Sequence, residues 1–323
     1  MPCASLCPRM KRKCIQIADG RHLNVSIEGL AARLNFSHKT LYMLSNHAAD
    51  HYRVWKIPKK NGRFRAIEAP DDLLKDVQRS ILQQVLPVEA DKIATAFEPG
   101  KSIIDNAQMH CRRHVVLNLD LKDCFPSIRF NLVAEFFREM GFDESVAILL
   151  STLCTLDGHL PQGAPTSPHL ANLVLRPFDK SLRQFCRRLS LNVTRYADDI
   201  TVSGALNDGK IEFVVEFIRR ELKKYGLRIN YRKLRVQRNT KRQEVTGLVV
   251  NDYPSVPRHV RRGLRQKMHY LEEFGVIDGA PPNEEQLRSL MGSVGFVLQV
   301  HPGNREFCGY ATTLQGMIAE MSA

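Results

Sequence analysis

The segment 191–203, LNVTRYADDITVS, places Asp198 and Asp199 side by side between two runs rich in β-forming residues. This pattern predicts a hairpin with the two aspartates at its tip. Adjacent carboxylates repel each other and are costly to desolvate unless a positive partner lies nearby. An exposed turn, in which aspartate is common, would also account for the pair alone. The hairpin therefore indicates a function only if other acidic residues meet it.

A third aspartate interrupts an apolar strand. Asp120 lies within VVLNLDLKDCFPSI (115–128), where an unpaired carboxylate is expensive. Side chains alternate along a strand, so Asp120 can face the hairpin if the two strands are neighbours. Mg²⁺ is held by carboxylates together with substrate phosphates, and two such ions can clamp both oxygens of an in-line displacement. We therefore predict that Asp120, Asp198 and Asp199 hold two Mg²⁺ ions for nucleotidyl transfer.

The charge and composition narrow the class of protein. The chain carries 47 Lys and Arg against 34 Asp and Glu, a net charge of +13, which favours a nucleic-acid partner over a merely solubilising surface. No apolar run is long enough to span a membrane and no signal peptide is evident, so we expect a cytoplasmic protein without membrane contact. The eight cysteines lack a C-x-x-C pair and indicate buried small side chains. The role of Cys3, Cys7 and Cys14 stays open, since their spacing fits no zinc template.

Periodicity along the chain predicts an α+β protein. We expect two short helices in 25–47, a hairpin around KKNG (59–62), and helices over 71–86, 130–140 and 208–225. A Gly/Pro loop opens 159–189 and leads into a long helix that Pro177 kinks. The segments 227–236 and 243–250 predict a strand pair, and 257–323 a basic helical region.

Several further residues are candidates for binding a nucleotide. The loop LPQGAP (160–165) precedes a helix whose N-terminus favours phosphate, and Gln162 can bond a sugar or base. The ring of Phe125, placed beside a sugar, would leave no room for a 2′-hydroxyl. An ordinary helix-entry loop and a core phenylalanine are the plainer alternatives. The predicted hairpin around 59–62 is basic, with Lys59, Lys60, Arg63 and Arg65. These side chains could bind a triphosphate, or they could form a solvated charge cluster.

A second basic group lies near the end of the chain. Its residues are spaced along one predicted helix and suit a phosphate backbone. Tyr253 and Tyr270 flank the group and are able to stack on bases. The group consists of Arg258, Arg261, Arg262, Arg265 and Lys267.

The ordered motifs NLDLKDCFPSI, LPQGAPTSP and RYADD resemble those of the reverse transcriptases, over roughly residues 25–310. Two shorter stretches are similar to motifs of the bacterial retron branch. Asn106 and His110 fit its N-A-x-x-H, and Val245, Thr246 and Gly247 fit its V-T-G.

The resemblance implies roles for individual residues. Asp120, Asp198 and Asp199 match the metal-binding triad, and Phe125 matches the gate that excludes ribonucleotides. Gln162 matches the nucleotide-contacting glutamine. Lys233 is only a candidate general acid, because LRINYRKLRV lacks the usual N-S-K-K-T, and Cys124 stands where phenylalanine is frequent. The remaining matches are Lys59 or Lys60 with Arg65 for the triphosphate, Tyr196 for the primer end, and the basic C-terminal helices for an RNA stem-loop.

The implied fold is a right-hand polymerase with fingers, an antiparallel-sheet palm and a helical thumb. We expect a basic leader at 1–24, N-terminal helices and fingers at 25–114, palm with part of the fingers, including the LPQG loop, at 115–250, and an RNA-binding helical thumb at 251–323. The implied activity is RNA-directed DNA synthesis from deoxynucleoside triphosphates on a cognate structured noncoding RNA. Retron enzymes start from a guanosine 2′-hydroxyl, form a branched RNA–DNA hybrid and serve anti-phage defence, so an effector protein is a further expected partner.

Three alternatives remain. The first is a reverse transcriptase of another bacterial class, from a group II intron, a diversity-generating element or a CRISPR system. The second is an RNA-dependent RNA polymerase, which usually has an aspartate where Phe125 stands. The third is an inactive RNA-binding scaffold, which would have no use for three converging carboxylates.

Overall fold

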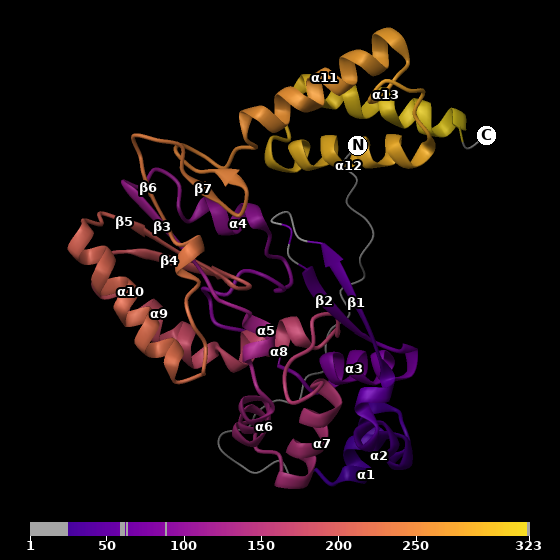
Figure 1. The fold of residues 1–323 in the computed structure, drawn as a ribbon, viewed down its shortest axis with the longest axis vertical. Coiled ribbons are helices and arrows are strands. Elements are labelled where there is room, and N and C mark those ends of the chain that lie inside the picture. The colour runs from indigo at the N-terminus through magenta and orange to yellow at the C-terminus, as the bar shows by residue number, and fades with distance from the viewer. Residues whose placement is uncertain (1–24, 59–61, 63, 88, 322–323) are drawn as a thin grey trace. The chain divides into compact units, whose positions relative to one another are not determined.

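The computed structural model describes residues 25–58, 62, 64–87 and 89–321 (Figure 1). Two compact units share the chain. Unit 1 comprises Met1–Lys101, Leu119–Ile200 and Asn207–Leu234, and unit 2 comprises Ser102–Asn118, Thr201–Leu206 and Arg235–Ala323. The chain therefore passes between the units several times.

Unit 1 contains a group of helices that contact one another around buried leucine, valine and phenylalanine side chains. The group is α1 (Ile27–Leu34), α2 (His38–Asn46), α3 (Asp72–Gln84), α6 (Phe130–Glu139) and α7 (Glu144–Cys154). The N-termini of α1, α2 and α3 are capped by side-chain oxygens of Ser26, Ser37 and Asp71. Each oxygen accepts a hydrogen bond from a backbone N–H in the first turn of its helix. The two helices predicted in 25–47 and the helices predicted at 71–86 and 130–140 are confirmed.

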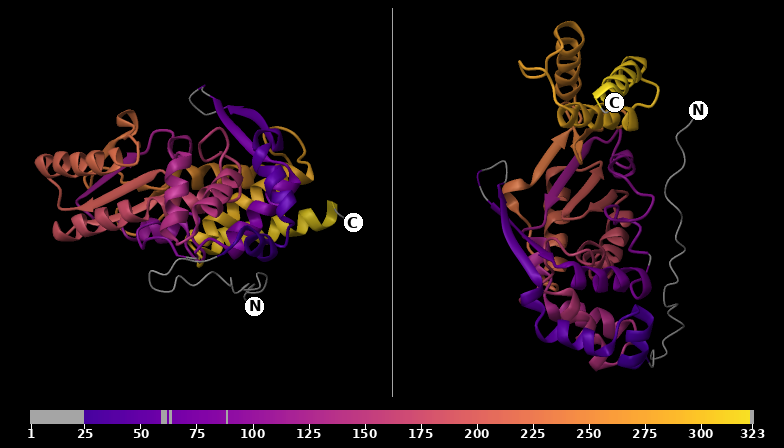
Figure 2. Two further views of the ribbon diagram at one scale, coloured as in Figure 1. Left: turned by 90° about the horizontal axis from the view of Figure 1, so that it is seen from below. Right: turned by 90° about the vertical axis from the view of Figure 1, so that its right-hand side faces the viewer.

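The predicted basic hairpin is also confirmed. After η1 (Ala48–His51), strands β1 (Tyr52–Pro58) and β2 (Phe64–Pro70) pair antiparallel in one continuous register, and both views of Figure 2 show them side by side. The candidates Lys59, Lys60 and Arg63 lie outside the described residues.

A four-stranded sheet has the order β4-β5-β3-β6. The sheet positions the aspartates, because β3 ends at Asp120 and the tip between β4 and β5 carries Asp198. Helix α9 (Arg176–Arg188) packs against β4 and against α10 (Asp208–Lys223), as Figure 1 shows. The strands are β3 (Val115–Asp120), β4 (Asn192–Tyr196), β5 (Asp199–Gly204) and β6 (Arg235–Arg238).

Two sequence predictions need correction. The long helix expected within 159–189 is divided into α8 (Ser167–Val174) and α9, because Pro177 in the first turn of α9 lacks the N–H that would continue α8. The strand pair expected from 227–236 and 243–250 does not form. Instead β6 pairs with β3, and the later segment folds on itself as β7 (Glu244–Val245) and β8 (Leu248–Val249).

Unit 2 has its own apolar core, which includes Met268, Val294, Phe307 and Leu314. Three long helices supply most of it, as predicted for the basic C-terminal region, and α4 (Ile103–Gln108), which periodicity missed, adds Ala107. None of the helices in the described part of the chain is both long and apolar enough to cross a bilayer. The three helices are α11 (Arg258–Phe274), α12 (Glu284–Val300) and α13 (Arg305–Met321).

Candidate active site

The strand that carries Asp120 lies directly beside the tip that carries Asp198. The backbone N–H of Leu121 donates a 2.8 Å hydrogen bond to the carbonyl oxygen of Asp198. Strands β3 and β5 are neighbours in the sheet, so the adjacency on which the predicted site depends is present. Asp120 is buried, Asp198 is half-buried and Asp199 is exposed.

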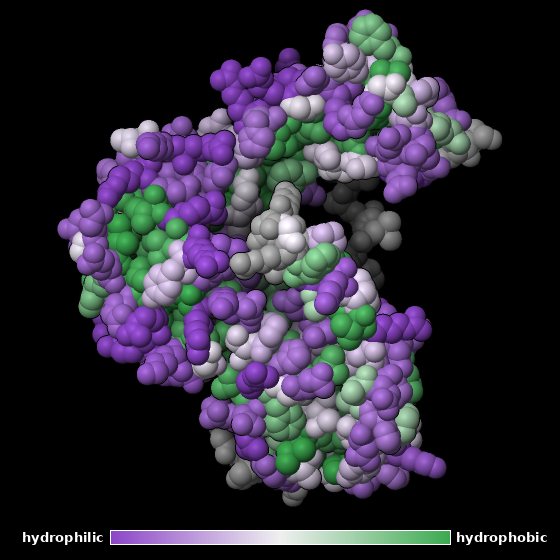
Figure 3. Space-filling view, in the orientation of Figure 1, coloured by the Kyte–Doolittle hydropathy of each residue, from purple (hydrophilic) through white to green (hydrophobic). Residues whose placement is uncertain are grey.

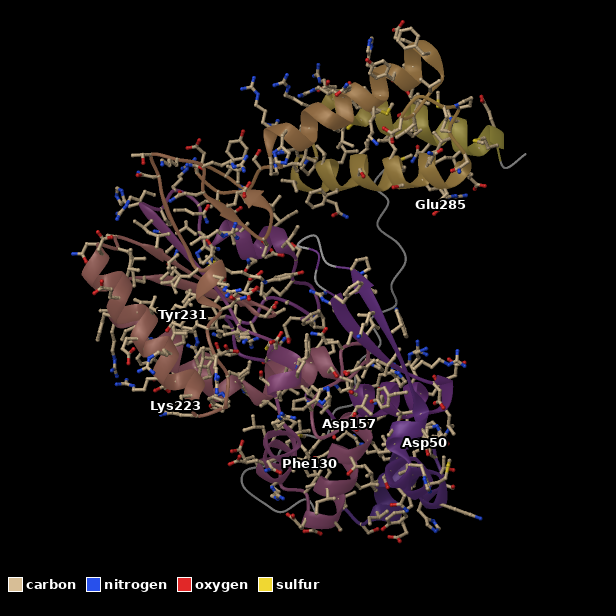
Figure 4. The ribbon with its side chains drawn as sticks, in the orientation of Figure 1. Asp50, Phe130, Asp157, Lys223, Tyr231 and Glu285 are labelled. Atoms are coloured by element: carbon tan, nitrogen blue, oxygen red, sulfur yellow. The ribbon has the colours of Figure 1, made fainter. Side chains whose placement is uncertain are left out.

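Two side chains hold the Asp120 carboxylate. Lys233 Nζ donates to Oδ1 at 2.5 Å, and Asn230 Nδ2 donates to Oδ2 at 3.0 Å. Both donors come from the segment at η2 (Tyr231–Lys233), which Figure 4 marks at Tyr231. The hydrogen bond to Asp120 raises the pKa of Lys233, so this side chain is a protonated donor. Lys233, a candidate from the sequence, therefore contacts the predicted metal ligand directly.

The acid pair creates an electrostatic cost. Burial raises the pKa of Asp198, and the nearby charge of Asp120 raises it further, while Lys233 and Arg65 act in the opposite direction. A divalent cation would relieve this repulsion, and carboxylate oxygens are the ligands that Mg²⁺ prefers. The donor set thus fits a cation in its chemistry. Among the described residues, however, no three His, Cys, Asp or Glu side chains are grouped closely enough to hold a metal ion, so the two-ion site stays a prediction.

The LPQG loop is fastened to β2. Glu68 N–H donates to the carbonyl oxygen of Gln162 at 2.8 Å, and Gln162 N–H donates to Glu68 Oε2 at 3.2 Å. Gly163 has φ +147°, and a Cβ there would lie 2.7 Å from the Glu68 carbonyl oxygen. Only glycine permits this approach, which brings Gln162 to the strand that carries Arg65. Sequence reasoning missed Glu68.

The other nucleotide candidates also belong to unit 1. Phe125 is half-buried in the short helix α5 (Cys124–Ser127), directly after Asp123, whose φ is +46°. Tyr196 is half-buried at the end of β4, and Arg65 is exposed in β2. Their assigned roles stay predictions.

In unit 2 the candidate basic residues of α11 have different surroundings, and Arg261 is half-buried. Arg265 forms two 2.7 Å bonds with Glu306, and Lys267 lies 2.9 Å from Asp278, so these two cations are already paired. Arg258 and Arg262 instead line a cavity of about 820 Å³. Figure 3 shows hydrophilic surface over the start of α11, and Figure 4 shows nitrogen-tipped side chains projecting there. The other lining residues are Arg242, which sequence reasoning missed, and His259, Gly263 and Gln266.

The two short retron-like motifs meet inside unit 2. Asn106 Nδ2 donates to Thr246 Oγ1 at 3.4 Å, across a separation of 140 residues. Thr246 and Gly247 form the tip of the β7–β8 hairpin with φ of +47° and +82°. Asn106 and His110 are buried, and His110 Nδ1 lies 2.7 Å from Ser203 Oγ. Asn106 therefore contacts the tip of the hairpin, whereas His110 contacts β5.

The sequence is similar to known reverse transcriptases. The profile of the family "Reverse transcriptase (RNA-dependent DNA polymerase)" matches residues 57–267. The retron Mx162 reverse transcriptase of Myxococcus xanthus is 35% identical over 90% of this chain and 67% of its own. The retron Mx65 enzyme of the same organism is 38% identical, over 75% of this chain and 62% of its own. The chain thus spans about two thirds of the length of these two relatives.

A shorter relative is covered almost completely. The retron Ec86 reverse transcriptase of Escherichia coli is 30% identical over 90% of this chain and 89% of its own. Among solved structures, telomerase from Candida albicans in complex with a fragment of telomeric RNA aligns at a TM-score of 0.49. That alignment has 15% identity and covers 82% of this chain and 56% of that chain. The family profile and the retron relatives show that the chain belongs to the reverse transcriptases, the RNA-dependent DNA polymerases with a right-hand fold, and within them to the retron type.

Proposed function

We propose that this chain copies part of a cognate structured noncoding RNA into DNA, adding deoxynucleotides to a primer hydroxyl with release of pyrophosphate. The observation that supports this most is the hydrogen bond from Leu121 to Asp198, which joins the strand of Asp120 to the Asp198–Asp199 tip. A buried acid beside an acidic tip serves little purpose in a protein that only binds RNA. Nucleotidyl transfer gives it one.

The proposed chemistry assigns the three aspartates to two Mg²⁺ ions. When bound, these ions would lower the pKa of the primer hydroxyl and neutralise the triphosphate. Lys233 Nζ lies 2.5 Å from Asp120 Oδ1, and we propose that this ammonium group donates a proton to the departing pyrophosphate.

The remaining candidates would bind and select the nucleotide. Gln162 would contact the incoming nucleotide from its loop on β2, and Arg65 would hold the triphosphate together with Lys59 or Lys60. Phe125 would close the space that a 2′-hydroxyl needs, and Tyr196 would support the primer end. The division into fingers (25–114), palm (115–250) and thumb (251–323) stays a prediction.

The retron relatives support a more specific proposal. Synthesis would begin from the 2′-hydroxyl of a guanosine in the RNA and leave a branched RNA–DNA hybrid. The hybrid would act in the cytoplasm with an effector protein in defence against phage. In this arrangement Arg258 and Arg262 of α11, which line the cavity of unit 2, would bind an RNA stem-loop.

The test is to purify the full chain from cells that contain its native locus and to sequence the nucleic acid that copurifies. We expect RNA and DNA of shared sequence, joined by a 2′–5′ linkage that a debranching enzyme cleaves. The Asp198→Asn variant should carry the RNA without DNA. Unbranched DNA would point to another bacterial class of reverse transcriptase. A folded, RNA-bound protein that carries no DNA would overturn the proposal.

A further inference from the structure

Arg195, the first residue of the RYADD motif, has its charged side chain inside unit 1 rather than at the surface. The side chain is 1% exposed, and that of its partner Asp179 on α9 is 0% exposed. Arg195 Nε and Nη2 donate to the two carboxylate oxygens of Asp179 at 2.7 and 2.5 Å. This bidentate pair satisfies the acid and orients the guanidinium.

The remaining nitrogen of the guanidinium, Nη1, donates hydrogen bonds to the turn before Asp198 and to α8. Arg195 Nη1 donates to the carbonyl oxygen of Ala197 at 2.9 Å and to Asn172 Oδ1 at 3.2 Å. Ala197 directly precedes Asp198 and has φ +56°, a left-handed conformation that is unfavourable for any residue with a Cβ. Such a conformation persists only where the surroundings enforce it.

The backbone of Arg195 is fixed as well. Its N–H donates to the Ile93 carbonyl oxygen at 2.7 Å, and its own carbonyl oxygen accepts from Thr95 N–H at 2.9 Å. Asn172 Nδ2 in turn donates to the Ala96 carbonyl oxygen at 2.8 Å. Arg195 is therefore anchored through its guanidinium on α8 and α9, and through its backbone on the segment 93–96.

Stability alone does not explain a buried ion pair at this place. A buried pair can often be replaced by apolar side chains of similar volume with little loss of stability, or even a gain. Apolar side chains would not, however, supply a hydrogen bond to Ala197. The feature that requires arginine is thus its contact with the strained residue before Asp198.

We propose that Arg195 is a positioning residue: its guanidinium, oriented by Asp179, holds the Ala197 carbonyl and so sets the left-handed turn that places Asp198 beside Asp120. The proposal rests on the proposed role of these two aspartates in nucleotidyl transfer. It predicts that the pair influences the catalytic rate and the Mg²⁺ requirement separately from stability.

The test uses the full chain extending a DNA primer on an RNA template, with kcat, KM for the deoxynucleotide, the Mg²⁺ concentration for half-maximal rate, and the unfolding midpoint measured for each variant. The double variant Arg195→Met with Asp179→Leu removes both charges and should stay folded. We expect its kcat to fall by about tenfold or more and its Mg²⁺ midpoint to rise, because 1.4 kcal/mol of misplacement is worth a factor of ten. A folded double variant with wild-type kcat and Mg²⁺ midpoint would overturn the proposal.

A second pair of variants decides the matter even if the double variant does not fold. Arg195→Lys keeps the charge but loses the fork that reaches both Asp179 and Ala197, so kcat should fall. Adding Ala197→Gly to Arg195→Lys removes the Cβ strain at the turn. The kcat of this double variant should be about fivefold higher than that of Arg195→Lys alone. If glycine restores nothing, Arg195 does not act through this turn.

Two controls separate the outcomes. Arg183, on the same helix as Asp179, forms a bidentate pair with Asp91 at 2.9 Å for both bonds, but its side chain is 35% exposed. Arg183→Met should lower the unfolding midpoint and leave the Mg²⁺ midpoint unchanged. Asp198→Asn should be inactive in the same assay. If Asp198→Asn is active, the function assigned to the aspartates fails; if it is inactive while the folded double variant is fully active, only the positioning role fails.

Discussion

Leu121 and Asp198 share a 2.8 Å backbone hydrogen bond, which places the strand ending at Asp120 against the turn that begins the Asp198–Asp199 pair. Residues almost 80 positions apart along the chain thus become hydrogen-bonded neighbours beside the ends of β3 and β5. The carboxylate of Asp120 is at the same time held by Lys233 and Asn230. The acidic tip, the buried acid and a protonated lysine therefore occupy one place in unit 1.

Replacing Asp198 by asparagine should abolish DNA synthesis. The change removes a proposed cation ligand worth several kcal/mol in the transition state, so we expect a loss of at least about 100-fold in kcat. Binding of RNA should survive, since the charge contacts proposed for RNA lie in unit 2. Primer extension and RNA filter binding check both points. Asp157→Asn, in an exposed turn, is the control, and full activity of Asp198→Asn would remove the aspartate assignment.

Phe125→Ala should admit ribonucleotides. The half-buried ring is proposed to fill the space of a 2′-hydroxyl, and its removal should improve the ratio of ribonucleotide to deoxynucleotide use by about tenfold or more. The measurement is kcat/KM for each nucleotide on the same primed template. Phe213→Ala, on the exposed face of α10, should leave the ratio unchanged. Unchanged discrimination in Phe125→Ala would place the gate elsewhere.

Gly163→Ala should disturb the LPQG loop and raise KM for the deoxynucleotide more than Gly158→Ala does. The new Cβ would lie 2.7 Å from the Glu68 carbonyl oxygen, so β2 and the loop must separate, at a cost of about 1–3 kcal/mol in the free energy of unfolding. KM for the deoxynucleotide should rise because Gln162 moves. Gly158→Ala also has a positive φ, of +72°, but meets no atom within 4 Å. Equal effects of the two variants on KM would contradict the role of the close approach.

Arg262→Gln should weaken RNA binding and lower its dependence on salt. Arg262 lines the cavity of unit 2, and each lost phosphate contact reduces the slope of log K against log salt by about one. Arg265→Gln is the matched control, because Arg265 is already paired with Glu306. Binding isotherms at several salt concentrations distinguish the two. Identical slopes in wild type and Arg262→Gln would show that this arginine does not meet RNA.

Acid should destabilise the protein through His110. Burial, with a smaller effect of the nearby Arg113 charge, lowers the pKa of His110 from 6.5 to about 3. Below pH 6.5 the unfolded chain therefore binds a proton at His110, whereas the folded chain does not. The contribution of His110 to the free energy of unfolding is complete above pH 6.5 and is lost as the pH falls toward 3. Between pH 7.5 and 5 this single group should remove about 2 kcal/mol from the free energy of unfolding.

The check is urea unfolding at both pH values in wild type and His110→Gln, which keeps a polar side chain near Ser203 but does not titrate in this range. The difference between the two pH values should shrink by about that amount in the variant. An unchanged difference would mean that other groups cause the acid sensitivity.

Local sequence was sufficient for much of the fold. The apolar periodicity of 71–86 and the capping acid Asp71 predict α3, and the turn residues between β1 and β2 predict their hairpin. The RYADD tip and the LPQG loop were also recognisable, because their unusual residues stand close together in the chain. In contrast, 227–250 was assigned wrongly, since the partner of β6 is β3, and strand pairing over that distance leaves no trace in local periodicity.

The candidate site divides in the same way. The sequence alone predicted an acidic tip, a buried acid and many basic side chains, because charge belongs to the residue type and the apolar residues around Asp120 indicate a buried strand. Only the tertiary structure decided that Leu121 meets Asp198, that Glu68 holds Gln162, and that Arg195 reaches Ala197 through the core. These are contacts between distant segments, and their geometry arises from the packing of whole elements, which no single stretch of sequence encodes.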